Sequence, residues 1–369
     1  METVWIFSEN FIITILVYIV VALSLNLEAG FTGIPNFGKH LFVYAGVFAA
    51  QGIGVRLTAF IIEKIAPDYA MQAIQEINQR SLTHVNSLVK AAADPATNRF
   101  AMPLMREFLL QHVGVEALIA MLLVVITILL GMFFGIIASY AAVKLKEDYL
   151  AILLLSFAEL MVMVIFYQVP WLSGGNQGIW AVTFTKNPIK FALIASGFLA
   201  ALSFLYAERI VNSPMGRAMR AVRDDEIAAS VFGRDVARIR LKVIMVASAM
   251  AALAGFTYIQ ITSSSLSISF NRVAWTFLPW AMIILGGMAN NWGAVLGTVV
   301  FLIGMRLFEY YQVEISSLLH LQGAGGEQLA NILVGVLILI VLYLRPQGIL
   351  PERPSRTGDF HKIMVEEGE

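Results

Sequence analysis

Cysteine is missing from this 369-residue chain, and charged side chains are scarce, at 14% of the residues. Without cysteine, the chain has no disulfide framework, thiolate nucleophile or iron–sulfur site. Soluble domains carry about 25% charged residues, so this composition, which is 59% hydrophobic, indicates a membrane protein. The five histidines show no close pairing, and no Ser-His-Asp motif is present, so we predict no metal site, no catalytic residue and no enzyme. A net charge of zero gives no reason to expect nucleic-acid binding.

Long apolar runs take the place of the missing charge and predict an all-α polytopic membrane protein. Runs of this length match the thickness of a bilayer when they are helical. We treat residues 1–369 as a single transmembrane domain, in which Gly131 and Gly135 have the spacing that allows two helices to pack closely. About nine spanning or re-entrant helices are predicted, at 10–29, 41–55, 115–143, 149–169, 191–211, 243–262, 273–289, 292–311 and 328–344.

The basic residues indicate how these helices are oriented. Segment 213–242 holds seven of the 25 Lys and Arg residues, and short cytoplasmic loops are enriched in such residues. If this segment is cytoplasmic, the tail at 345–369 is cytoplasmic too and the N-terminus is outside. Segment 63–114, whose apolar residues have helical spacing, then becomes an extracytoplasmic amphipathic insertion that Asp94-Pro95 divides. The short outside loops keep only Lys186, Lys190 and Arg272.

Segment 213–242 also has the local signals of two short helices. Ser213 followed by Pro214 is typical of a helix start. Asp224 is expected to cap the second helix, and Gly233 to end it in a left-handed conformation. A compact pair of helices suits insertion into a groove of another protein. Charge alone equally supports a solvated loop that only fixes the orientation of the chain.

The run SPMGRAMRAVRDDEIAASVFG, followed by IRLKVIMVASAMAALAG, resembles the permease subunits of high-affinity branched-chain amino acid ABC importers of the LivM type. Other matches keep the order of that family, among them LNL with Gly30, the SGGNQG loop, LGGM with Gly293, and RPQG. The resemblance implies that a short helix in segment 213–242 contacts an ATPase subunit. The coupling residues it implies are Arg217, Arg220, Asp225, Glu226, Ala228, Ala229 and Gly233.

The resemblance also implies partners and a location. These are a second, related permease subunit, two ATP-binding subunits and an extracytoplasmic solute-binding protein, in the cytoplasmic membrane of a prokaryote. ATP is expected on the partners and no cofactor on this chain. The stretch from Gly33 to Lys39 reads G-x-x-x-x-G-K, but it lacks the following Ser or Thr and a βαβ setting, so we do not interpret it as a phosphate loop.

Candidates for the substrate pathway are polar groups at helix breaks and inside spans. Broken helices expose backbone groups that suit an amino-acid zwitterion, and ordinary turns are the alternative. The breaks at 30–38 and 286–293 contain Asn36, Asn290 and Asn291, and Glu159 lies within a span. Arg306 and Glu309 are spaced to form a pair. The outer-loop candidates for contact with substrate or the binding protein are Ser173, Gly174, Gly175 and Asn176.

Two other functions stay open from the sequence. Members of the same family carry urea and short amides, and the departure from the family pattern at 34–38 permits such a substrate. A secondary transporter that does not use ATP is the second alternative. It needs acidic residues in the membrane to relay ions, and Glu159 is the one plausible candidate.

Overall fold

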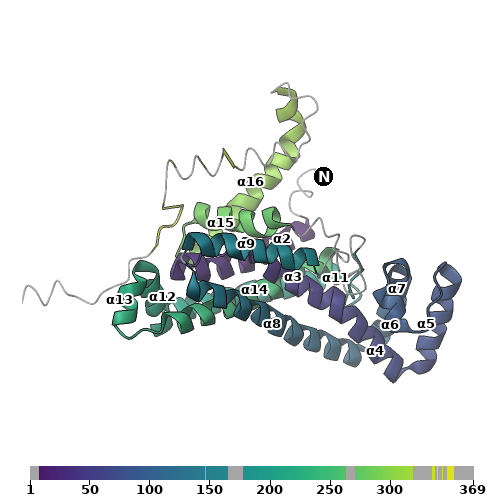
Figure 1. The fold of residues 1–369 in the computed structure, drawn as a ribbon. Helices are drawn as coiled ribbons and strands as arrows, with labels where there is room; N and C mark the ends of the chain where they lie inside the picture. Colours follow the sequence, from purple (N-terminus) through teal and green to yellow (C-terminus); the bar gives the residue numbers. More distant parts are fainter. Residues whose placement is uncertain are drawn as a thin grey trace, which may run out of the picture.

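The computed structural model describes residues 8–145, 147–164, 178–262, 271–318 and 347–352, together with 335, 336, 339 and 343. The described elements are helices packed into an elongated bundle (Figure 1). Helices α12 and α13 lie at one end of this bundle, and α5, α6 and α7 lie at the other (Figure 1).

Helices α2 (Glu9–Leu25) and α14 (Val236–Thr262) form the centre of the bundle, and α14 packs along α8 (Val113–Lys144), α3 and α2. The spacing of Gly131 and Gly135 predicted this close packing of α8, and the structure confirms it. A Cβ atom on Gly131 would lie 2.9 Å from Ala249 Cα of α14, and one on Gly135 would lie 2.9 Å from Ser248 Oγ. The two backbones can approach this closely only because neither position has a side chain.

Three helices are interrupted or extended by π-helical turns, in which one extra residue widens the helix. Helix α2 continues into η1 (Asn26–Gly30), and α3 (Lys39–Phe48) passes through η2 (Ala49–Gly54) into α4 (Val55–Ile65). Helix α15 (Leu278–Gly286) follows η6 (Val273–Phe277).

The predicted insertion is helical. It contains α5 (Pro67–Arg80), α6 (Leu88–Ala93) and α7 (Pro95–Gln111). Asp94 accepts a hydrogen bond from the Ala96 amide and Pro95 is the first residue of α7, which confirms the predicted break. The amide of Asn98 and the backbone of Trp180 exchange hydrogen bonds, so the insertion packs against the segment that precedes α11 (Pro188–Val211).

Six helices among the described residues are long and apolar enough to cross a membrane, compared with the nine predicted. Two predicted spans form shorter apolar helices, at Tyr149–Met163 within α9 (Glu147–Met163) and at Val273–Gly286. The second ends early because Gly287 has a φ of 114°, a conformation that no helix continues through. The predicted last span, 328–344, lies largely outside the described residues.

Candidate coupling site at α12 and α13

The helices α12 (Pro214–Asp224) and α13 (Glu226–Val231) form the predicted pair. The Ser213 hydroxyl accepts a hydrogen bond from the Met215 amide at 3.1 Å, and Pro214 follows it, which confirms the predicted start. The predicted cap of the second helix was wrong by one residue. Asp224 ends α12, whereas Asp225 has the extended backbone that a cap requires and accepts hydrogen bonds from the amides of Ile227 and Ala228, each at 2.9 Å.

Gly233 ends α13 as predicted, with a φ of 75°. The Gly233 amide donates to the Ser230 carbonyl and the Arg234 amide to the Ala229 carbonyl, both at 3.0 Å. This pair of bonds is a Schellman motif, which needs a left-handed residue at this position. A Cβ atom on Gly233 would meet nothing within 4 Å, so the requirement for glycine is conformational and not steric.

One face of α13 and the residue after it present large apolar side chains to the surroundings. Ile227, Val231 and Phe232 are 76%, 78% and 84% exposed. We call these three residues the α13 patch. Ala229 is buried on the opposite face, and Ala228 is half-buried. Exposed apolar side chains that cluster on a projecting element are typical of a contact surface for another protein.

An ion pair fastens α13 to the central helix α14. The Arg240 guanidinium donates to both carboxylate oxygens of Glu226, at 2.9 and 3.2 Å. The Arg240 side chain is 7% exposed and the Glu226 side chain is 49% exposed, so this fork-to-fork contact is buried on the arginine side and open to water on the carboxylate side. Glu226, a predicted coupling residue, therefore holds α13 in place.

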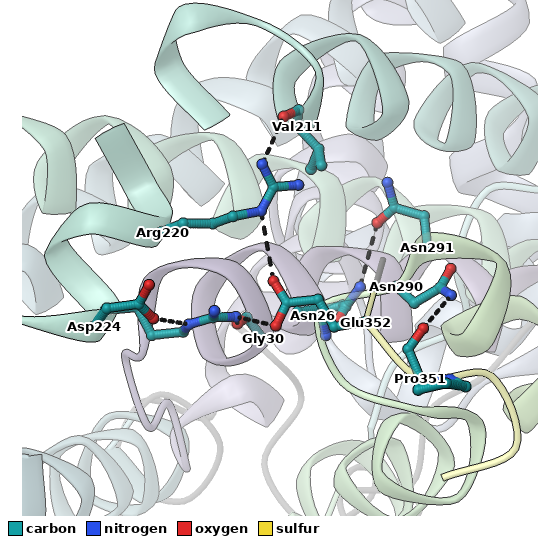
Figure 2. Close-up of polar contacts among 11 residues, drawn as sticks. Asn26, Gly30, Val211, Arg220, Asp224, Asn290, Asn291, Pro351 and Glu352 are labelled. Carbon is teal, nitrogen blue, oxygen red and sulfur yellow. Dashed lines mark hydrogen bonds and ion pairs between the residues drawn. The ribbon is translucent and has the colours of Figure 1, made fainter. Parts of the chain in front are cut away.

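The arginines of α12, among them the predicted coupling residues Arg217 and Arg220, point in two directions. Arg217 is exposed. Arg220 and Arg223 point inward and share the carboxylate of Glu352, at 3.5 and 3.1 Å (Figure 2). Arg220 also lies over the ring of Phe31, 5.3 Å from its centroid. Two of the seven basic residues thus hold α12 against the bundle.

Three segments that are distant in sequence meet beneath α12, and we call them its seat: η1, the turn between α15 and α16 (Asn291–Leu318), and residues 347–352 (Figure 2). Arg223 Nη1 donates to the Gly30 carbonyl of η1 at 2.8 Å. Asn26 accepts from the Ala289 amide at 2.9 Å and donates to Asn291 Oδ1 at 3.2 Å. The seat therefore connects the first span to the turn that precedes α16.

Asn290 and Asn291, which the sequence placed on the substrate pathway, lie in this seat. The Asn290 side-chain oxygen caps α16 by accepting from the Trp292 amide, and its nitrogen donates to the Pro351 carbonyl at 3.0 Å. The 286–293 break is thus a tight turn in which the Asn290 side chain bonds to protein, whereas Asn291 Nδ2 is buried with no hydrogen-bond partner among the described residues.

Asn36 is fully buried in a charged cluster that the sequence did not predict. Lys39 Nζ and Glu28 Oε2 lie 2.8 Å apart, and both side chains are 0% exposed. The Asn36 amide donates to the same Glu28 oxygen at 3.1 Å and accepts from the Gly38 amide. This cluster braces the segment between the first span and α3. Its sequence signal is a lysine eleven residues after a glutamate at the end of an apolar run.

Glu159 has a different setting, since its side chain is 42% exposed. Arg272 Nη1 lies 3.4 Å from its carboxylate, and Nε2 of the buried His40 lies 3.9 Å away. Glu159 therefore stays a candidate for the substrate pathway. Arg306 and Glu309 pair at 2.9 Å as predicted. Ser173, Gly174, Gly175 and Asn176 lie outside the described residues.

Taken together, the apolar helices and the projecting helix pair define a multi-pass α-helical membrane protein. The chain belongs to the family of permease components of branched-chain amino acid transport systems, which matches residues 7–342. This is a family of membrane transport subunits and not of enzymes.

Named relatives cover much of the chain. It is 35% identical to the probable branched-chain amino acid transport permease protein LivM of Methanocaldococcus jannaschii, over 95% of this chain and 94% of the relative. It is 25% identical to the high-affinity LivM permeases of Salmonella typhimurium and Escherichia coli, over 59% of this chain and 54% of each relative. No solved structure matches the chain.

Proposed function

We propose that this chain is one permease subunit of an ABC importer for branched-chain amino acids in the cytoplasmic membrane of a prokaryote. Its partners are a second, related permease subunit, two ATP-binding subunits and an extracytoplasmic solute-binding protein. The names of the relatives support the substrate. The observation that carries the proposal is the α13 patch, because it is an exposed apolar surface on a helix that is capped and fastened at fixed positions.

The contacts of α13 support a mechanism in which ATPase movement reaches the membrane helices. The ATPase surface packs on the α13 patch, and its movement on binding ATP displaces α13. Because Glu226 ties α13 to Arg240 of α14, the displacement is passed to the helix at the centre of the bundle. The proposed importer has two conformations, one open to each side of the membrane. The difference in free energy between them then depends on whether ligand and nucleotide are bound.

The contacts between loops support the proposed orientation. The segments that basic residues assign to the cytoplasm, 213–242 and 345–352, contact one another through Arg223 and Glu352. The segments assigned to the outside also contact one another, since Arg106 of the insertion donates to the carbonyls of Thr185 and Lys186. None of these contacts joins a segment assigned to the cytoplasm to one assigned to the outside.

Glu159 and Arg272 offer opposite charges that suit the two ends of an amino-acid zwitterion. Glu159 lies in a segment of the bundle assigned to the membrane, where unpaired charge is costly and charged groups normally face a water path or another helix. In the proposed importer, this pair lines the pathway beside the second permease subunit, with Glu159 facing the ammonium group and Arg272 facing the carboxylate.

The proposal is tested by expressing the chain with the neighbouring transport subunits, purifying the complex and measuring uptake of radiolabelled leucine into proteoliposomes. We expect uptake that requires ATP, the ATPase subunits and the solute-binding protein. Labelled urea in the same assay separates the amide alternative. Leucine uptake by the chain alone, unaffected by ATP depletion, would contradict the proposal.

The α13 patch is tested by Phe232→Asp. Truncations at the centre of an interface often cost about 2 kcal/mol or more, so we expect retention of the ATPase subunits during purification to fall by about tenfold or more. Leu82→Asp is the matched control, since Leu82 is also fully exposed and lies in the insertion at the far end of the bundle. Equal retention in the two variants would exclude the patch as the contact surface.

A further inference from the structure

Residues 347–352 form a short strap that lies across the end of α15 and beneath α12. The Ile349 amide donates to the Leu285 carbonyl at 2.9 Å, and the Leu350 amide donates to the Gly286 carbonyl at 2.8 Å. The strap packs directly on the backbone of the turn, because a Cβ atom on Gly287 would lie 2.1 Å from the Leu350 carbonyl oxygen. Backbone contacts thus fix the position of Glu352, the last described residue of the strap.

The Glu352 carboxylate is the point at which the strap holds α12. Oε2 lies 3.1 Å from Arg223 Nη1, and Oε1 lies 3.5 Å from Arg220 Nε. The same Nη1 of Arg223 donates to the Gly30 carbonyl. The Glu352 carboxylate therefore joins α12 to the strap on the turn before α16 (Figure 2), whereas Arg223 itself joins α12 to η1.

Other contacts of α12 do not involve Glu352, among them the bond from Arg223 to Gly30 and the contact of Arg220 with Phe31. Ala218, Met219 and Val222 are buried, and Gly216 packs on the backbone of Val211 at the end of α11. These contacts keep α12 folded and seated beside α11 when Glu352 is neutralised. Neutralising Glu352 then removes only the link between α12 and the strap. Arg220 and Arg223 no longer pair with a carboxylate that moves with the strap and the turn.

We infer that Glu352 is a positioning residue that transmits movement of α12 and α13 to the strap and to the turn between α15 and α16. The inference rests on the proposed function, since it concerns the coupling of ATP hydrolysis to uptake. It assigns the strap a role as the second route from α13 into the membrane helices, beside the Glu226–Arg240 pair. Arg220 and Arg223 belong to this route and not to the surface that meets the ATPase.

The test uses the complete complex in proteoliposomes and measures leucine uptake and ATP hydrolysis in the same sample. For Glu352→Gln we expect the complex to assemble and to hydrolyse ATP, with uptake per ATP reduced at least about fivefold, the lower end of coupling effects between sites. Glu352→Asp keeps the charge and should recover part of this loss. Glu76→Gln is the matched control, since Glu76 forms an exposed ion pair with Arg80 in the insertion and should leave the ratio unchanged.

A second measurement separates coupling from folding. The chain has no cysteine, so Arg223→Cys with Glu352→Cys introduces the only two thiols. We expect the double variant to be uncoupled and a short bifunctional maleimide to restore uptake per ATP. If the wild-type complex imports leucine and Glu352→Gln keeps the wild-type ratio, the inference is wrong while the proposed function stands. If the wild-type complex imports nothing, the proposed function itself fails.

Discussion

Gly233→Val changes the one residue of α13 that must adopt a left-handed conformation. The φ of 75° is accessible to glycine, whereas it costs an ordinary L residue about 1–2 kcal/mol and is least favourable for a β-branched residue. A Cβ atom at this position would meet no atom within 4 Å, so its addition brings no clash to mix with this conformational cost.

Valine can avoid the cost only by moving the end of α13. That movement breaks the bonds from the Gly233 amide to Ser230 and from the Arg234 amide to Ala229, each worth about 1 kcal/mol. By either route the native conformation at the end of α13 becomes about 1–2 kcal/mol less stable. Its population relative to other conformations of this end then falls about 5- to 30-fold. Phe232, at the cap position beside Gly233, is displaced with it.

The assay is uptake per ATP hydrolysed, together with hydrogen exchange of the α13 amides. We expect Gly233→Val to reach the membrane in normal amounts, to lose uptake per ATP and to exchange faster in α13. Gly233→Asn should give uptake per ATP and exchange rates between those of the wild type and of Gly233→Val, because asparagine tolerates the left-handed region. Gly304→Val is the control, since Gly304 lies inside helix α16 and also has no atom within 4 Å of the added Cβ. Normal coupling and unchanged exchange in Gly233→Val would refute the reasoning.

Three further predictions concern the packing around this site. Arg240→Gln leaves Glu226 without its fork-to-fork partner, so we expect α13 to become about 1–3 kcal/mol less stable and to be proteolysed faster. Arg238→Gln, which removes an exposed ion pair, should have little effect. Lys39→Met leaves the buried Glu28 carboxylate without its partner and should lower the free energy of unfolding by about 3–5 kcal/mol, measured by thermal unfolding. The double variant with Glu28→Met should recover most of that loss, and a double variant less stable than the single variant would contradict a buried ion pair. Gly131→Val places a side chain against α14 and should lower the free energy of unfolding by about 1–3 kcal/mol relative to Gly304→Val. Equal melting temperatures of these two variants would show that α8 and α14 are not in close contact.

Local signals in the sequence predicted local structure. Ser213-Pro214 and Gly233 marked the ends of the helix pair because capping depends on a few neighbouring backbone groups. The error at Asp224 has the same origin, since two adjacent aspartates offer equivalent caps and only the length of α12 decides between them. Gly131 and Gly135 were recognisable because small residues at this spacing let two helix backbones approach closely.

The sequence predicted the local pair of Arg306 and Glu309, but not the partners of charged residues that lie farther apart in the chain. Arg223 meets a carboxylate 129 positions later in the chain, which depends on how the strap docks on α15. Glu28 and Lys39 are nearer in sequence, but their pairing requires the intervening segment to fold back into the bundle. Hydropathy likewise does not show that Gly287 ends α15, so the span predicted at 273–289 forms a shorter apolar helix, at Val273–Gly286.

The contacts of segment 213–242 favour a force-transmitting loop over one that only fixes orientation. An orientation signal needs positive charge near the membrane, and exposed lysines and arginines supply it without further structure. Segment 213–242 instead pairs Arg220 and Arg223 with Glu352 of the strap. It also pairs Arg240 of α14 with Glu226 of α13, and it caps both short helices. Each of these features restricts how α13 can move relative to α14 and the strap. An orientation signal has no use for this restriction, whereas a helix that passes a partner's movement into the membrane requires it.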